Sequence, residues 1–155
     1  MRRSDREVTD KVAIEEFIAG EKIMRVGFCD CGEVYIVPVN YGYSVDDGMY
    51  TFYFHGAKAG RKFELAESMP AVGFEIDGRY SLIPAETACD HSAEFMSVVG
   101  TGRLSIINDN NEKIKALNCI MKQVSGRDIW DYPEKQLDGT AVFRLRAEKM
   151  SCKAK

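Results

Sequence analysis

The sequence predicts a mainly β protein, a small antiparallel barrel with a few helices packed on its outside. About six segments rich in β-branched and aromatic residues read as strands. The gaps between the early segments have hairpin length, and the regular β-α-β alternation of a parallel sheet is missing. At 155 residues the chain is expected to form a single domain over residues 1–155.

The N-terminal part of the chain predicts a loose arm followed by a short helix. Residues 1–9 are charged and are expected to be loose. From Asp10 to Ala19, the apolar residues Ile14, Phe17 and Ile18 recur at helical spacing, and Gly20 supplies a stop. We therefore expect an amphipathic helix that buries these three side chains.

Three strands are expected next, and together they predict an antiparallel meander. Their ranges are 23–29, 34–43 and 49–55, with turn signals at 30–32 and 46–48. Pro38 lies inside the second strand and cannot donate a ladder hydrogen bond. It therefore marks an edge, a bulge, or a place where something other than a strand meets the backbone.

The second half of the chain predicts a mixture of strands and helices. The expected elements are a short helix at 60–68, strands at 71–77, 95–108 and 141–150, and an irregular stretch at 81–94. A long helix is expected after the strand at 95–108. Gly100 and Gly102 indicate a bend or bulge in the strand at 95–108. The long helix is expected to open at Asn110 or Asn111 as N-cap. Its expected apolar face consists of Ile114, Leu117, Met121 and Val124.

Composition and charge narrow the classes of function. With 45% hydrophobic and 29% charged residues, the chain is typical of a soluble globular protein. A net charge of −3 with mixed signs gives no general attraction to nucleic acid or to an anionic membrane. We find no signal peptide and no apolar run of about 20 residues, and the five cysteines are an odd number. These features predict a cytoplasmic protein with reduced thiols.

A metal site is not expected. Cys29 and Cys31 flank one aspartate, and Cys89 and His91 flank another, but this spacing matches no zinc pattern. No motif for a resolving cysteine indicates redox catalysis by Cys31.

The stretch FHGAKAGRK at 54–62 predicts an anion site. Here a strand ends, two glycines free the backbone, and Lys58, Arg61 and Lys62 converge where a helix begins. Arg61 offers a planar fork for phosphate oxygens, and Lys62 offers a point charge. The alternative is a solvated basic turn. The letters match neither the triphosphate loop GxxxxGK[ST] nor GxGxxG.

The stretch VPVNY at 37–41 predicts a place where a flat ligand lies against backbone left unpaired by Pro38. Asn40 offers donor and acceptor groups for the edge of a heterocycle. The alternative is an edge strand with a structural proline. His55, beside the basic loop, can relay protons near neutral pH, although a lone histidine also serves as a structural residue.

Four motifs in order carry a resemblance to a known family. They are MRRSDRE at 1–7, YIVPVNYGY at 35–43, YFHGA at 53–57 with GRK at 60–62, and SVVGTG at 97–102. Together they closely resemble the 5-nitroimidazole-resistance (Nim-type) flavoproteins of the pyridoxamine 5'-phosphate-oxidase-like superfamily. The resemblance covers nearly the whole chain and rests on the combination of motifs, since each motif alone is weak.

The resemblance implies an FMN-binding split β-barrel that forms a homodimer with flavins at the subunit interface. FMN is the expected cofactor, with FAD as an alternative and haem as a more distant one. The segment lining the isoalloxazine ring, largely through backbone atoms, would be Val37, Pro38, Val39, Asn40 and Tyr41. The other implied contacts are Phe54, His55 and Gly56 along the ring and ribityl chain, Arg61 and Lys62 at the phosphate, and Ser97 from either subunit.

The resulting functional expectation is an FMN-dependent oxidoreductase that reduces small, planar, electron-poor compounds, with His55 as the catalytic proton donor. Nitroimidazole reduction is the activity that kinship suggests. Phe95-Met96 replaces the family's aromatic-Arg pair, and Gly56 stands where relatives often carry Ser or Thr, so the substrate is left open. The alternatives are a non-catalytic module that binds or senses flavin or haem, and a structural protein without a cofactor.

Overall fold

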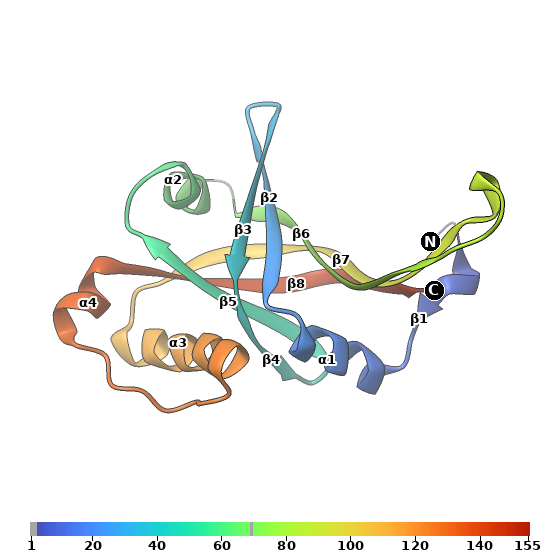
Figure 1. The fold of residues 1–155 in the computed structure, drawn as a ribbon. Helices are drawn as coiled ribbons and strands as arrows, with labels where there is room; N and C mark the ends of the chain where they lie inside the picture. The colour runs from blue at the N-terminus through green and yellow to red at the C-terminus, as the bar shows by residue number, and fades with distance from the viewer. Residues whose placement is uncertain (1–2, 69) are drawn as a thin grey trace.

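A computed structural model describes residues 3–68 and 70–155, so Met1 and Arg2 of the N-terminal motif lie outside the described residues. This part of the chain forms one antiparallel sheet with the strand order β3-β2-β6-β7-β8-β5-β4, and β1 pairs with β8 (Figure 1). The sheet is strongly curled, and α1 and α3 lie on one side of it while α2 lies on the other (Figure 1). The mainly β, antiparallel split-barrel fold expected from the sequence is therefore confirmed.

The bounds of the elements follow the sequence patterns closely at the start and less closely later. The strands are β1 (Glu7–Val8), β2 (Ile23–Asp30), β3 (Glu33–Asn40), β4 (Gly42–Asp46), β5 (Met49–Ala57), β6 (Ala71–Ile83), β7 (Ser92–Ile107) and β8 (Thr140–Ala154). The helices are α1 (Lys11–Gly20), α2 (Arg61–Ser68), α3 (Asn110–Ser125) and α4 (Glu134–Gly139), with 3-10 turns at Ser4–Arg6 and Ala88–Asp90.

The predicted three-stranded meander is wrong, because the segment 34–43 is two strands. β3 pairs with β2 and β4 pairs with β5, so that β3 and β4 lie at opposite edges of the sheet order. Between them Tyr41 is fully buried and its hydroxyl donates to the Ile18 carbonyl at 2.6 Å. Burying this side chain turns the backbone, and the turn closes the split barrel. Pro38 lies in an edge strand, one of the three outcomes expected for it.

The interior of the barrel is filled by aromatic side chains from several strands. Phe52 lies 5.1 Å from Phe74 and 5.8 Å from Tyr41 between ring centroids. Helix α1 closes this core with Phe17 and Ile18, and Asp10 caps the helix by accepting from the Val12 N–H. The predicted first helix and its buried face are thus confirmed.

The N-cap of helix α3 is Asp109, one residue before Asn110 and two before Asn111, and it accepts from the Glu112 N–H at 2.9 Å. Its buried face also differs from the predicted one, and Val124 is exposed. The buried residues of the helix are Lys113, Ala116, Leu117 and Ile120. Leu117 of the predicted face is buried, and at Gly42 the α3 backbone lies directly on β4: a Cβ at position 42 would overlap the peptide between Cys119 and Ile120.

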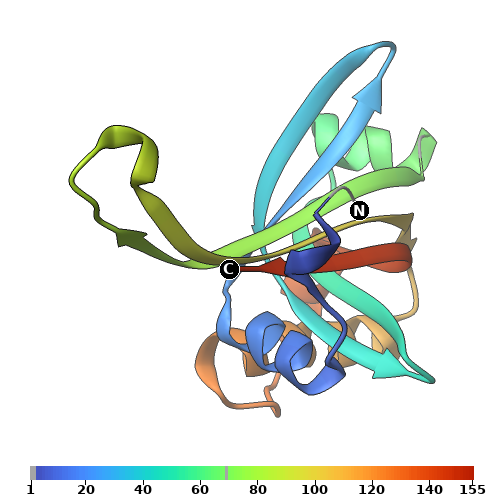
Figure 2. The same ribbon diagram turned by 90° about the vertical axis from the view of Figure 1, so that its right-hand side faces the viewer.

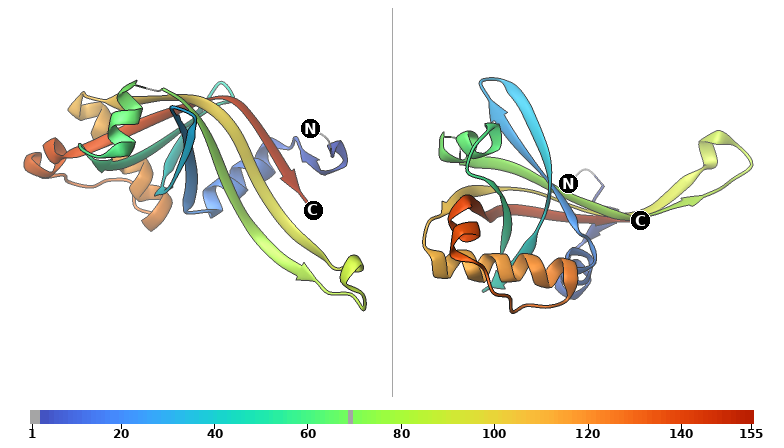
Figure 3. Two further views of the ribbon diagram at one scale, coloured as in Figure 1. Left: turned by 90° about the horizontal axis from the view of Figure 1, so that it is seen from above. Right: turned by 60° about the vertical axis from the view of Figure 1, so that its left-hand side comes forward.

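The stretch 81–94, expected to be irregular, belongs largely to a two-stranded arm that projects from the body (Figure 2). Ser81 pairs with Glu94 and Ile83 with Ser92, beyond a bulge after Gly78. The arm has no core to bury, so its exposed apolar residues show no alternation, and the strand signal is weak. Figure 3 shows the arm extending well away from the helices.

Two further features concern the ends of elements. The N-terminal arm is not wholly loose, because Glu7 and Val8 pair with Lys153 and Cys152 of β8. The expected bulge in the long strand is confirmed, since the β7–β8 register shifts between Thr101 and Gly102. Among the described residues, no helix is long and apolar enough to cross a membrane.

Candidate functional site

Lys62, in the first turn of α2, is a half-buried cation whose ammonium lies near a carbonyl and two aromatic rings. Its Nζ donates to the His55 carbonyl at 3.2 Å and lies 5.7 Å and 5.4 Å from the ring centroids of Phe54 and Phe143. Gly56 makes room for this position, because a Cβ there would lie 2.6 Å from Nζ. Within residues 3–68 and 70–155, no carboxylate forms an ion pair with Lys62, and burial lowers its pKa. A bound anion would supply the missing counter-charge.

Arg61, the neighbouring residue, already has acidic partners. Its Nε donates to Asp30 Oδ2 at 3.0 Å and its Nη2 donates to Glu33 Oε2 at 3.0 Å. The guanidinium also lies 4.9 Å above the ring of Tyr35, and these hydrogen bonds raise the pKa of Arg61. The two carboxylates come from the end of the β2–β3 hairpin and were missed in the sequence, where Asp30 and Glu33 flank an ordinary turn. Phosphate binding by Arg61 stays a prediction.

The segment 37–41 alternates between buried and exposed side chains, and its contact with a flavin ring stays a prediction. Val39 and Tyr41 are buried, whereas Pro38 and Asn40 are exposed on the other face of β3, and Val37 is half-buried. The Asn40 amide donates to the Lys22 carbonyl at 3.0 Å, which ties β3 to the start of β2. A ligand at this edge of the sheet would therefore meet main-chain groups first.

Phe54 and His55 lie on opposite faces of β5, because successive side chains of a strand alternate. Phe54 is buried and stacks on Phe143 with ring centroids 4.9 Å apart, so only its backbone is accessible. The exposed imidazole of His55 lines a cavity of about 190 Å³ beside Tyr132 and Leu137, on the face away from Lys62. The protein atoms around the ring, and then the charge of Lys62, lower the pKa of His55. Both effects favour the neutral imidazole over the imidazolium.

Ser97 lies far from the other predicted residues within one chain. On β8, Lys153 pairs with Ser97 whereas Val142 pairs with His55. These two β8 residues are eleven positions apart, which corresponds to roughly 35 Å of extended strand. A single copy of the chain therefore does not bring Ser97 to Lys62.

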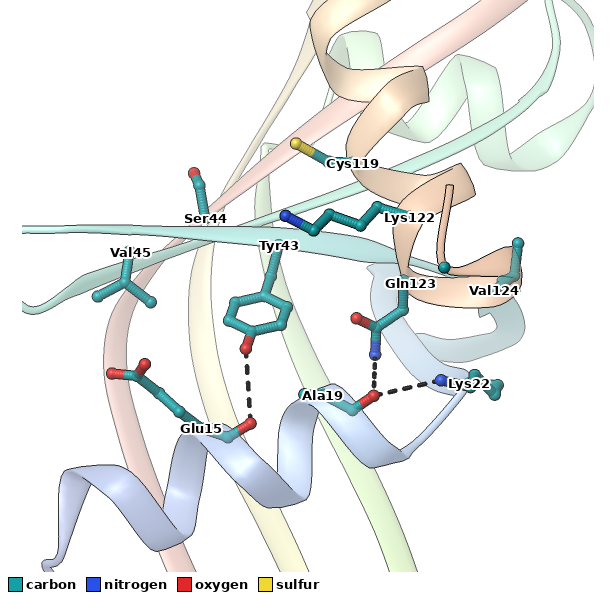
Figure 4. A pocket seen from close by; sticks show the side chains of 11 residues that line it. Glu15, Ala19, Lys22, Tyr43, Ser44, Val45, Cys119, Lys122, Gln123 and Val124 are labelled. Carbon is teal, nitrogen blue, oxygen red and sulfur yellow. Dashed lines mark hydrogen bonds between the residues drawn. The ribbon is translucent and has the colours of Figure 1, made fainter. Parts of the chain in front are cut away.

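A different cavity, of about 670 Å³, lies between α1, β4 and α3 and contains none of the predicted residues (Figure 4). Gln123 donates from its amide to the carbonyls of Ile18, Ala19 and Glu21 at 2.7, 3.1 and 2.7 Å. Lys22 also donates to the Ala19 carbonyl. The Gln123 bonds join the C-terminal ends of α3 and α1, so this side chain has a structural role in the cavity.

The cysteines and acidic residues form no metal cluster within the described ranges. No group of three or more His, Cys, Asp or Glu side chains that could hold a metal lies together there. All five cysteines are free thiols. His91 Nδ1 lies 2.8 Å from the Thr87 carbonyl, at the tip of the projecting arm.

The curled antiparallel sheet defines a split-barrel protein with a cluster of basic residues where its fifth strand meets α2. The model of the pyridoxamine 5'-phosphate oxidase family matches residues 10–154, and the chain belongs to this family. A comparison with curated proteins finds no significant match.

Several solved structures share the fold. A candidate 5-nitroimidazole antibiotic resistance protein from Bacteroides thetaiotaomicron is 28% identical with a TM-score of 0.82, covering 96% of this chain and 86% of its own. The flavocytochrome Anf3 from Azotobacter vinelandii is 22% identical with a TM-score of 0.81, covering 100% and 72%. The FAD and heme binding protein from Mycobacterium smegmatis is 15% identical with a TM-score of 0.84, covering 96% and 73%. The family resemblance read from the motifs is confirmed.

Proposed function

We propose that the protein binds FMN, with its phosphate at Lys62. The observation that carries this proposal is the half-buried Lys62 ammonium, which has a glycine beneath it and no carboxylate partner within the described residues. The backbone at 37–41 lies at the neighbouring edge of the sheet and would support the flat ring. Membership of the pyridoxamine 5'-phosphate oxidase family supports a phosphorylated, planar ligand.

The bound flavin would supply electron transfer, and the chain would supply binding and a proton. Lys62 would balance the phosphate charge, and the main chain at Gly56 would let the ligand approach closely. His55 would donate a proton to a reduced, electron-poor substrate from its imidazolium form, which it regains from solvent and which its lowered pKa makes the minor form near neutral pH. The proposed activity is the reduction of small planar compounds such as nitroimidazoles, as kinship with the Bacteroides protein suggests.

This activity is tested with the purified protein and a nitroaromatic oxidant. We expect the protein to retain or take up FMN, and its reduced flavin to be reoxidised by the nitroaromatic faster than free reduced FMN in buffer. Replacing His55 with alanine should slow that step by about 10- to 100-fold without changing FMN affinity. His91→Ala is the matched control, because it removes the other histidine at the arm tip.

The results separate the proposed enzyme from its rivals. If reoxidation is no faster than in buffer while FMN still binds, the protein is a flavin-binding module without this activity. If the released chromophore is FAD or haem, the FMN assignment is wrong.

We further propose that a second copy of the chain covers the open face of β3, β2, β6 and β7. That face carries an apolar groove of about 460 Å³, with Gly27 and Gly73 in its floor. Ile36 and Val99 stand beside it with 60% and 51% of their surfaces exposed. An uncovered apolar groove of this kind is typical of an interface, and a second copy would also let Ser97 reach the partner's flavin.

Sedimentation of the protein checks this arrangement. We expect a dimer of the 17.4 kDa chain, and we expect Ile36→Lys to shift it to monomer and weaken FMN binding. Val12→Lys changes an equally exposed apolar residue on α1 and should leave the dimer intact. A wild-type protein that sediments as a monomer would contradict the proposed dimer.

A further inference from the structure

The β2–β3 hairpin occupies the part of Arg61 that a phosphate would use. Nε of Arg61 donates to Asp30 Oδ2, and Nη2 lies 2.8 Å from Asp30 Oδ2 and 3.0 Å from Glu33 Oε2. These two nitrogens form one edge of the guanidinium, and a phosphate forms its paired hydrogen bonds with such an edge. Nη1 takes no part in these ion pairs. A phosphate can therefore gain full use of Arg61 only by displacing a carboxylate.

The geometry of the hairpin explains why the carboxylates hold this arginine. Asp30 and Glu33 are direct cross-strand partners on either side of a two-residue turn, in which Cys31 and Gly32 have φ of 50° and 94°. Like charges at directly opposite positions destabilise an antiparallel pair. Arg61 relieves that repulsion by bonding to both. Its departure would leave two facing carboxylates without a shared cation.

We propose that Asp30 and Glu33 determine how strongly the site prefers a phosphorylated flavin, because they compete with the phosphate for Arg61. This inference rests on the proposed flavin site. Two carboxylates and one guanidinium leave a net negative charge where a phosphate dianion must approach. Lys62 then provides the main attraction for the phosphate. Because the hairpin carboxylates occupy Arg61, the protein prefers FMN over riboflavin less strongly than it would if both Arg61 and Lys62 bound the phosphate.

The test compares FMN with riboflavin, which has the same ring and lacks the phosphate. The double variant Asp30→Asn, Glu33→Gln keeps the shape of both side chains and removes their charges. From the size of surface charge interactions we expect this variant to bind FMN roughly tenfold more tightly, as read from quenching of flavin fluorescence. Riboflavin affinity should change less than about twofold, because it lacks the charge concerned.

Three further variants make the test specific. Adding Arg61→Ala to the double variant should remove most of the gain, because most of it acts through the released guanidinium. Glu33→Gln alone disturbs the hairpin least and should give a smaller gain of the same kind. Glu148→Gln removes a carboxylate that pairs with Arg103 at 3.2 Å, away from the hairpin, and should change neither affinity.

The outcomes distinguish this inference from the flavin proposal. If wild type binds FMN and the double variant binds it no more tightly, the competition is wrong and the flavin site stands. An equal gain for riboflavin, or a gain that survives Arg61→Ala in full, also overturns the competition. If neither protein binds FMN or riboflavin, the flavin site is wrong and the competition falls with it.

Discussion

Replacing Lys62 with methionine is expected to weaken FMN binding by about 100-fold, which corresponds to about 2.7 kcal/mol at one half-buried charge-assisted contact. Methionine keeps an apolar side chain of similar length and removes the ammonium, which lies over the rings of Phe54 and Phe143. Riboflavin has no phosphate, so its affinity should fall by less than about threefold. Titration calorimetry with both flavins measures the two changes directly.

The control for this variant is Lys58→Met, which removes an exposed cation from the same loop. It is expected to lower FMN affinity by less than about threefold, since an exposed charge is screened by solvent. Equal losses for FMN and riboflavin would mean that Lys62 supports the structure of the site, and the phosphate would then have to lie elsewhere. An unchanged FMN affinity would remove the observation on which the proposed function rests.

Replacing Gly42 with alanine is expected to destabilise the protein by about 3 kcal/mol, because the added Cβ would overlap backbone rather than a movable side chain. The peptide between Cys119 and Ile120 would have to move, and with it the seat of α3 on β4. For a chain of this length the melting temperature should fall by roughly 10 °C. Thermal unfolding followed by circular dichroism gives this value.

Gly139→Ala is the matched control, because a Cβ at that position in α4 would meet nothing within 4 Å. It is expected to be neutral or to raise stability slightly, since alanine lowers the conformational entropy of the unfolded chain. If Gly42→Ala melts at the same temperature as Gly139→Ala, the close contact between β4 and α3 is not a determinant of the fold.

Local sequence patterns were sufficient to predict the structure where a residue's neighbours in sequence are also its neighbours in space. Helix α1 was predicted with its range and its buried face, because Ile14, Phe17 and Ile18 recur within the turns of one helix. The bulge near Gly102 was read in the same way, and the edge position of Pro38 was one of the three outcomes that its missing N–H predicted. The strands at 23–29 and 49–55 also appear close to their expected limits.

Patterns failed where a distant element decides the outcome. The residues at 34–43 look like one strand, and only the burial of Tyr41 against α1 and the contact of Gly42 with α3 divide them. Residues 81–94 form most of an arm that projects from the body (Figure 2) and covers no core, so no alternation of apolar and polar residues marks their pairing. The face that α3 buries is likewise set by the strand beneath it.

By itself the sequence determined the fold class, the family and the cluster of basic residues after the fifth strand, because these rest on local spacing and on residue types. Only the tertiary structure decided which of the two neighbouring cations is free of acidic partners. Arg61 is held by Asp30 and Glu33, about thirty positions earlier, and Lys62 lies over Gly56 without a carboxylate among the described residues. Electrostatic pairing depends on distance in space. Chain folding brings both carboxylates to Arg61 and brings none of the described carboxylates to Lys62.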